Sequence, residues 1–117
     1  MAHVDPMIYK IFKNDEWVEL RDQGETFGAP IDLADGFIHF STAATVQKTA
    51  ALYFTGVADL WLAAFDEVEL EDALKWEPSR GGELFPHLFR KLKLTEMSWC
   101  VPLPDTPDGH EFPDDLA

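Results

Sequence analysis

Cysteine is nearly absent from this chain of 117 residues, and Cys100 is the only one. A single cysteine excludes an internal disulfide and a cysteine-rich zinc cluster. Cys100 lies between apolar neighbours in SWCVPL, where we expect an inert thiol rather than a nucleophile. A bound structural metal is therefore not expected.

Long apolar runs are absent as well. No stretch approaches the roughly 20 apolar residues of a membrane span, and the N-terminal MAHVDP lacks the basic start and apolar stretch of a secretory signal. We therefore expect a cytoplasmic protein that does not bind membranes. A length of 117 residues with 46% hydrophobic residues indicates one domain around a single modest core.

Basic residues are scarce, with nine Lys and Arg against 22 Asp and Glu, which gives a net charge of −13. This charge opposes binding to nucleic acid, so a small-molecule partner is favoured; the oligomeric state is open and a monomer is assumed. Four of the nine bases lie within residues 80–93, so a local anion site is compatible with the acidic whole. The segment 105–117 is acidic and rich in Pro and Asp, and it is expected to be a flexible tail behind a globular domain of residues 1–104.

Apolar periodicity predicts short strands and two main helices. A helix capped by Asn14 ends near Gly24, and Ser41 or Thr42 is expected to cap the second helix. Pro86 is expected to place its strand at a sheet edge or a bulge. The strands do not alternate regularly with helices, so we expect an α+β domain with two small antiparallel or mixed sheets. The expected strands are 7–12, 36–40, 59–66, 84–94 and 97–103, the helices 15–23, 43–54 and a turn or two in 67–76, and the loops 24–35 and 78–82.

Among the familiar catalytic motifs, P-loop, GxGxxG, HExxH, GxSxG and CxxC are all absent. Histidine then becomes the main candidate for chemistry near neutral pH. His3 and His110 lie in the expected flexible ends. His39 and His87 lie inside apolar strands, FIHFS and FPHLF. Each is either a core histidine or a residue that faces a ligand, and spacing alone does not decide between the two.

Local features favour a ligand site near His39. Strand alternation places His39 and Ser41 on one side of their strand, and a strand that leads into a helix leaves backbone amides free for an anion. Arg80 and Arg90 flank His87 along the chain. Alternatively, the basic residues near Arg90 only form a solvated strand face.

The segments DGFIHFSTAATVQKTAALYF, LKWE and FPHLF resemble a small bacterial family known as domain of unknown function 952. The likeness spans residues 7 to 103 and implies an ADP-ribosyltransferase-like fold. The same segment is similar to the part of poly-ADP-ribose polymerases where a tyrosine stacks on nicotinamide. The resemblance places His39 at that tyrosine, as in the RNA 2′-phosphotransferase branch of that superfamily.

The resemblance implies NAD, or an ADP-ribose-like nucleotide, as the cofactor. Lys10 takes the place of a ribose-binding histidine, and His87 lies nearest to the position of a missing glutamate. Without that glutamate, an acceptor that is already anionic, such as a phosphate, needs no general base. We therefore expect His39, His87 and Lys10 as catalytic residues and no metal ligands. The expected cofactor-binding residues are Tyr9, Gly36, Phe40, Ser41, Thr42, Tyr53, Arg80 and Arg90.

Two other functions stay open. One is a non-enzymatic module that keeps the fold and binds a nucleotide or a protein segment at a degenerate site, for which Lys10 is the evidence. The other is a phosphodiesterase built on His39 and Ser41, because HFST resembles half of the H-x-[ST] signature of two-histidine phosphodiesterases. His87 is followed by LFR, which has no hydroxyl at the matching position.

Overall fold

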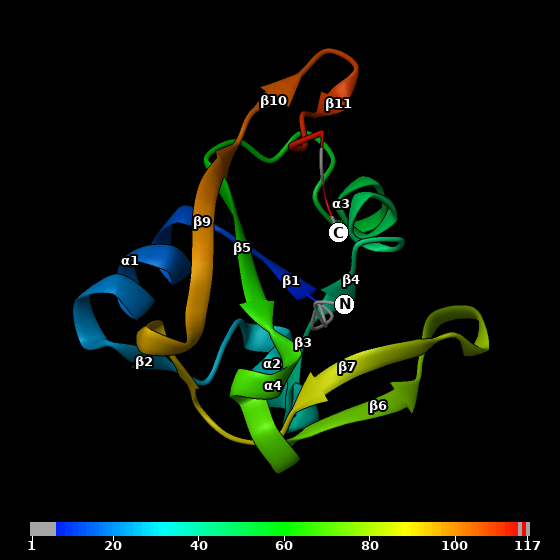
Figure 1. Cartoon of the computed structure of the whole chain (residues 1–117). Helices are drawn as coiled ribbons and strands as arrows, with labels where there is room; N and C mark the ends of the chain where they lie inside the picture. The colour runs from blue at the N-terminus through cyan, green and yellow to red at the C-terminus, as the bar shows by residue number, and fades with distance from the viewer. Residues whose placement is uncertain (1–6, 115, 117) are drawn as a thin grey trace, which may run out of the picture.

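The strands β1 (Met7–Phe12) and β5 (Leu60–Asp66) lie at the centre of the largest sheet in the computed structural model, which describes residues 7–114 and 116. Both carry apolar side chains on their two faces, as a strand covered on both sides requires. The strand order is β4-β1-β5-β9, with β4 (Ser41–Thr42) and β9 (Met97–Leu103) at the edges and all neighbours antiparallel (Figure 1).

A second sheet has three antiparallel strands in the order β3-β7-β6, namely β3 (Ile38–His39), β7 (Leu84–Leu88) and β6 (Leu74–Pro78). Two further pairs join β2 (Glu25–Thr26) to β8 (Leu92–Lys93), and β10 (Asp105–Thr106) to β11 (Gly109–His110). The α+β class with small antiparallel sheets is confirmed, although the described residues form four sheets rather than the two expected.

The helix α1 (Asn14–Gln23) ends at Gly24, whose φ of 80° is left-handed, as its sequence predicts. Its N-cap is Lys13 rather than Asn14, because the carboxylate of Glu16 accepts a 2.9 Å hydrogen bond from the Lys13 amide. The helix α3 (Val46–Tyr53) begins three residues later than expected.

We expected Ser41 or Thr42 to cap α3, and this expectation is wrong. Both residues form β4 and pair with β1. Thr45 is the N-cap residue, and its hydroxyl accepts a 2.9 Å hydrogen bond from the amide of Thr42. The amide of Thr45 in turn donates to the carbonyl of Thr42 at 3.1 Å. At least two backbone amides at this corner are therefore already paired within the protein.

Residues 24–35 were expected to form only a loop, and this expectation is wrong. They contain the short helix α2 (Pro30–Asp35), which has Pro30 in its first turn and ends at Gly36 with φ 84°. Proline suits the first helical position and glycine the position after the last, so these two residues explain the helix.

The segment 67–76 was expected to be helical, but only its first part is. The helix α4 (Glu67–Leu70) and the 3₁₀ turn η1 (Glu71–Ala73) are followed directly by β6. Pairing of β6 with β7 along five residues explains the change, since tertiary pairing overrides weak local preference.

Pro86 lies in the middle strand of its sheet, so the expectation of an edge or a bulge is wrong. Its carbonyl accepts a 3.0 Å hydrogen bond from the Phe40 amide. The Pro86 carbonyl therefore points toward the β3 side of the strand rather than toward β6. Pro86 and Trp76 on β6 are then a pair without backbone hydrogen bonds, so the missing amide of proline costs no bond there.

The four-stranded sheet separates two clusters of buried apolar residues. One cluster includes Ile8 and Phe65 and packs against Leu20 of α1 and the three-stranded sheet. The other includes Leu62 and packs against Val46 of α3. Successive side chains of a strand point to opposite faces, so β1 contributes residues to both clusters. It therefore lies between α3 on one side and the three-stranded sheet on the other.

The C-terminal segment, predicted as a flexible tail, contains a hairpin of β10 (Asp105–Thr106) and β11 (Gly109–His110). The His110 side chain is buried and its Nε2 lies 2.8 Å from the carbonyl of Val57. Phe112 and Leu116 pack against the second apolar cluster. In this structure the segment therefore lies on the domain. Residues 115 and 117 of the tail, and His3, lie outside the described residues.

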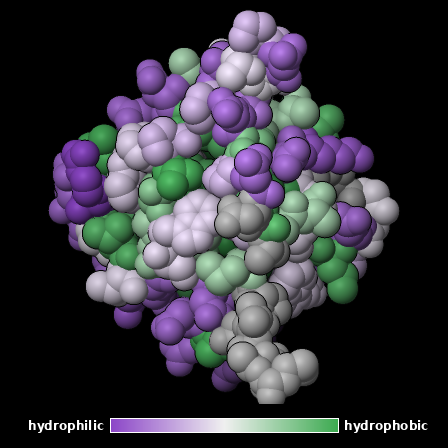
Figure 2. All heavy atoms as spheres, turned by 45° about the horizontal axis from the view of Figure 1, so that its top comes forward, coloured by the Kyte–Doolittle hydropathy of each residue, from purple (hydrophilic) through white to green (hydrophobic). Residues whose placement is uncertain are grey.

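Apolar and hydrophilic residues are interspersed on the face shown in Figure 2. Within residues 7–114, no helix has the length and apolar character needed to cross a bilayer. The cytoplasmic location stays a prediction.

Candidate functional site

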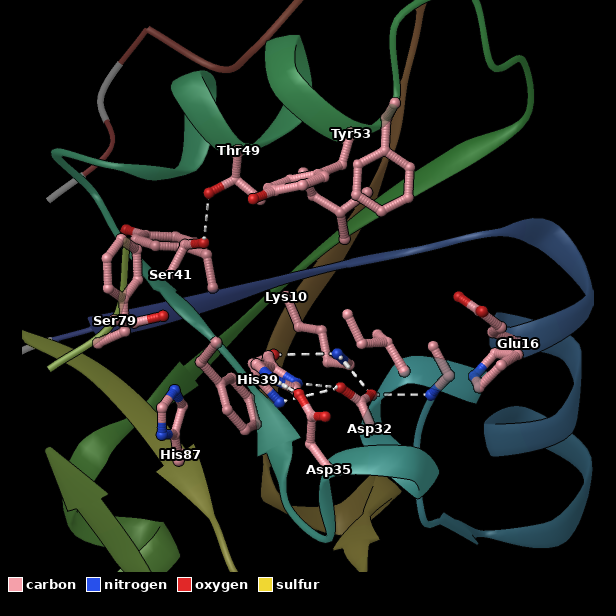
Figure 3. A pocket seen from close by; sticks show the side chains of 18 of the residues that line it. Lys10, Glu16, Asp32, Asp35, His39, Ser41, Thr49, Tyr53, Ser79 and His87 are labelled. Atoms are coloured by element: carbon pink, nitrogen blue, oxygen red, sulfur yellow. Dashed lines mark hydrogen bonds and ion pairs between the residues drawn. The ribbon is translucent and has the colours of Figure 1, made fainter. Parts of the chain in front are cut away.

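A pocket of about 530 Å³ opens where β1, α2, β3, α3 and β7 meet (Figure 3). The aromatic wall of the pocket consists of Tyr9, Phe40, Phe54 and Phe85. Tyr53 lies over this wall from the end of α3. The Tyr53 side chain is 65% exposed and the other aromatic residues near the sheet are mostly buried. The pocket therefore has a mainly apolar, aromatic wall with a polar floor, as small-molecule sites commonly have.

Asp32 is the fully buried acid at the polar end of this pocket. One carboxylate oxygen lies 3.0 Å from the Nζ of Lys10 and accepts from the Ala29 amide at 2.7 Å. The other accepts from both Nδ1 and the backbone amide of His39, at 2.7 and 3.1 Å. Burial by itself would raise the pKa of Asp32, but these hydrogen bonds and the charge of Lys10 outweigh it and lower that pKa to about 2.

The local chain brings Asp32 to this position through a glycine. Gly28 has φ +100°, and a Cβ atom there would lie 2.1 Å from the Asp32 carboxylate. Only glycine therefore permits this close approach of backbone and carboxylate.

His39 lies between two carboxylates. Its Nδ1 faces Asp32 at 2.7 Å and its Nε2 faces Asp35 at 3.0 Å (Figure 3). An imidazole can donate from both nitrogens only when it is doubly protonated. His39 therefore has no free ring nitrogen, although its side chain is 30% exposed in the pocket.

Lys10 is buried on the same side of β1 as Ile8 and Phe12, as the alternation of side chains along a strand requires. Its Nζ donates to the carbonyl of His39 at 2.9 Å and pairs with Asp32. The structure thus brings Lys10 to the pocket, with its charge compensated by a buried carboxylate.

His87 lies directly opposite His39 across β3 and β7, with the ring centroids 5.3 Å apart. Its side chain is buried, and its Nδ1 lies 2.8 Å from the carboxylate of Glu77 on β6. Its Nε2 is buried without a hydrogen-bond partner among the described residues. A buried polar atom left unpaired costs about 1–3 kcal/mol, so such an atom beside a pocket indicates a place for a ligand.

Hydroxyl groups line the wall opposite the histidines. Ser41 lies in the pocket, buried, with its Oγ 3.0 Å from the Oγ1 of Thr49 on α3 (Figure 3). His39 and Ser41 share this pocket, but both ring nitrogens of His39 face carboxylates and Ser41 faces Thr49. The geometry therefore offers no direct His39–Ser41 pair.

The charged residues around the pocket are mostly acidic. The bases Lys10 and Lys13 face the acids Glu16, Asp32 and Asp35. Burial raises the pKa of Glu16, against the opposing hydrogen bond from the Lys13 amide. The wall consequently suits a ligand end that is neutral or cationic better than a phosphate.

Four predicted cofactor-binding residues are not part of this pocket. Gly36 ends α2 and lies with Arg90 at a smaller hollow of about 210 Å³. The Arg90 guanidinium is held by the carboxylate of Glu96 at 2.6 Å. Thr42 bonds Thr45 instead. Arg80 belongs to the turn η2 (Arg80–Gly82) next to Ser79 of the lining, and its side chain lies outside the described part of the chain.

Three acids that matter for the site were missed by sequence reasoning. Asp32 and Asp35 lie in the segment taken as a loop, where Pro30 and Gly36 were the available signals of a helix. Glu77 directly follows the segment 67–76 that was taken as helical, and alternation with Lys75 in LKWE was the available signal of a strand. Among the residues described, no group of three or more His, Cys, Asp or Glu could hold a metal ion.

One family model and the structures of one protein match this chain. The model of a family described as protein of unknown function (DUF952) matches residues 11–100. The crystal structure of protein CC0527 from Caulobacter crescentus is 45% identical, with a TM-score of 0.85 over 89% of this chain and 91% of that chain. Its solution NMR structure, also at 45% identity, has a TM-score of 0.80 over 89% and 90%.

A comparison with curated proteins found no match. None of the matches concerns the ADP-ribosyltransferase fold, so that resemblance stays a prediction.

Proposed function

We propose, from the premise that this chain belongs to the DUF952 family, that its pocket binds NAD or an ADP-ribose-like nucleotide. The observation that carries the proposal is that His87 lines a pocket with aromatic walls while its buried Nε2 lacks a partner in the described structure. A hydroxyl at the ribose end of such a ligand, its own or that of a water molecule or alcohol bound beside it, supplies the donor that this nitrogen needs.

Size and charge support the same ligand class. A volume of about 530 Å³ lies in the range of about 300–1,000 Å³ that is usual for small-molecule sites. The nicotinamide ring of NAD carries a positive charge, which suits a wall where Asp32, Asp35 and Glu16 outnumber the lysines. We therefore propose that the nicotinamide riboside end enters the pocket and that the phosphates stay near exposed Lys13.

The test is an NMR titration of the purified protein with NAD, ADP-ribose and nicotinamide riboside, read at the ring resonances of His39, His87 and His110. We expect shifts at His39 and His87, and none at His110, whose ring faces Val57. His87→Gln should weaken binding by about 2–10-fold, the loss of one hydrogen bond. His110→Gln, which changes a buried histidine away from the pocket, should leave binding unchanged.

Absence of a shift at both His39 and His87 at saturating NAD and ADP-ribose would overturn the proposal. Thermal unfolding gives an independent readout, because a ligand at 100 times its dissociation constant stabilises the folded state by about 2.7 kcal/mol.

The second candidate is a non-enzymatic module that binds a nucleotide or a protein segment. The ion pair of Lys10 with Asp32 favours it, because this lysine is engaged inside the protein at the place where the resemblance expects a ribose-binding histidine. Lys10→His distinguishes the two functions. A gain of NAD-glycohydrolase or transferase activity on this substitution would indicate a degenerate enzyme site.

A further inference from the structure

We infer that Glu77 and His87 form a proton-transfer pair that activates a neutral hydroxyl, from water or an alcohol, against the ribose carbon of the bound nucleotide. This inference rests on the proposed function and names its acceptor. It differs from the expectation from sequence that the site lacks a general base and needs an anionic acceptor. Glu77 is the positioning residue, and His87 is the group that meets the acceptor.

The orientation of the His87 ring assigns its two nitrogens different roles. The carboxylate of Glu77 can only accept a hydrogen bond, so the proton lies on Nδ1 of His87, 2.8 Å away. In the neutral ring, Nε2 then carries a lone pair and is the basic atom. A carboxylate on the far nitrogen also stabilises the ring after it has gained a proton, which is how a general base is commonly supported.

Packing holds this ring in place. Phe37 stacks on it with centroids 4.2 Å apart and planes inclined by 25°, and His39 meets it edge-on. The ring points from β7 toward the side of the pocket that carries Ser79 and Ser41 (Figure 3). A rigid ring with one paired and one unpaired nitrogen is arranged for proton transfer rather than for core packing, where both nitrogens would gain from a partner.

The other histidines of the described residues lack this arrangement. His39 has a carboxylate at each ring nitrogen, and His110 directs Nε2 to the carbonyl of Val57. His87 is the histidine whose buried nitrogen has no partner among residues 7–114 and 116.

The step balances as follows. Nε2 of His87 takes the proton of the hydroxyl while the hydroxyl oxygen forms a bond to the ribose C1′ carbon. The bond from C1′ to the nicotinamide nitrogen breaks, and its electron pair stays on that nitrogen and neutralises the ring. Nicotinamide leaves, the sugar keeps the new oxygen substituent, and His87 later returns the proton to solvent. With water the products are nicotinamide, ADP-ribose and a proton.

The acidic wall suits the transition state of this step. Cleavage of a glycosidic bond passes through a sugar with strong positive charge, and carboxylates held beforehand near that charge stabilise it without reorganisation. Asp35 is half-exposed in the pocket and Asp32 is buried next to it. A phosphate acceptor would meet the exposed carboxylate of Asp35, which favours a neutral hydroxyl.

Several charged groups lie around His87. Glu77 on β6 faces Nδ1 of His87, and Lys75 on the same strand is the register partner of His87. His39, with Asp35 beyond it, faces the ring from β3. Glu77→Gln removes one negative charge and keeps an acceptor for Nδ1, so this substitution tests the charge separately from the orientation.

The experiment measures nicotinamide release from NAD by chromatography, in water, in aqueous methanol and in phosphate buffer, with NAD affinity measured in parallel. We expect hydrolysis in water, a methyl riboside product in methanol, and no phosphate adduct. His87→Gln should lower kcat by about 10²–10⁴-fold, the usual contribution of a general base, with NAD affinity changed by no more than about tenfold. His110→Gln is the matched control and should keep both values.

Glu77→Gln should retain NAD binding and move the acidic limb of the pH–rate profile to lower pH, because the positive ring loses a nearby negative charge. A purely structural role for Glu77 would lower folding stability without moving that limb.

The outcomes separate the two proposals. If NAD and ADP-ribose do not bind, the proposed function fails and this inference fails with it. If NAD binds but neither water nor methanol releases nicotinamide, the inference is overturned and the binding function stands. Unchanged turnover in His87→Gln, or a phosphate adduct formed in preference to a methyl product, also overturns it.

Discussion

His39 and His87 are directly paired across two antiparallel strands, with ring centroids 5.3 Å apart, yet their ring nitrogens have opposite surroundings. His39 has a carboxylate at both nitrogens, whereas His87 has one at Nδ1 and no partner at Nε2 among the described residues. The first arrangement is that of a structural residue, and the second leaves an unpaired ring nitrogen on a residue that lines the pocket.

Asp32→Asn should destabilise the fold strongly. The substitution leaves the buried Lys10 ammonium without its counter-charge, and removing one partner of a buried ion pair costs about 3–5 kcal/mol. Urea unfolding measures the change. Asp35→Asn is the control, because Asp35 is 45% exposed and should cost no more than about 1 kcal/mol. Equal losses in both variants would contradict a structural role for the buried pair.

Asp32 should also make stability depend on pH in acid. Its pKa is about 2 in the folded protein against an ordinary 3.8, so its contribution is complete above about pH 4 and is lost as pH falls through about 2. The difference amounts to about 2 kcal/mol. The stability gap between the natural chain and Asp32→Asn should therefore narrow by that amount between pH 4 and pH 2, measured by urea unfolding at each pH. A constant gap would show that the pKa of Asp32 is not lowered.

Gly28→Ala should disrupt the polar end of the pocket. The new Cβ would lie 2.1 Å from the Asp32 carboxylate at a left-handed φ of +100°. We expect a loss of about 2–4 kcal/mol from the conformational cost and the clash together. Gly24→Ala shares a left-handed φ of +80° but has no atom within 4 Å, so only about 1–2 kcal/mol should be lost. Thermal unfolding of the two variants compares them, and a smaller loss at Gly28 would contradict the contact.

Cys100 should react slowly with iodoacetamide in the folded protein. Burial raises its pKa to about 11, so roughly one thiol in a thousand is ionised at pH 8. An ordinary thiol ionises about a hundred times more at that pH. Mass spectrometry measures the rate of alkylation. The control is the same protein unfolded in about 8 M urea. Equal rates in the two conditions would refute the prediction.

The C-terminal hairpin should be protected from solvent despite its acidic composition. The amide of Glu111 donates to the carbonyl of Pro104 at 2.9 Å, and His110 is buried beside Val57. Hydrogen exchange read by NMR should show a slowed amide at Glu111, and His110→Gln should speed its exchange. An amide that exchanges at the rate of an unstructured peptide would instead support the flexible tail predicted from the sequence.

Sequence reasoning located the parts of the fold that depend on local patterns. The strand 7–12 and the helix from Asn14 to Gln23 follow from apolar alternation and from Gly24 at the helix end. It failed for 74–78, because LKWEP becomes a strand only when β7 is beside it. Local preference there is weak, and the strand forms only through pairing with residues six to fourteen positions away.

The sequence by itself determined the α+β class and the apolar settings of His39 and His87, because strand period and composition are local properties. Only the tertiary structure decided that Asp32 lies buried between Lys10 and His39, and that Glu77 leaves one nitrogen of His87 unpaired. The physical reason is that a polar side chain takes its role from the partners it meets on burial. Those partners come from α2 and β6, two segments whose structure depends on packing against the rest of the chain.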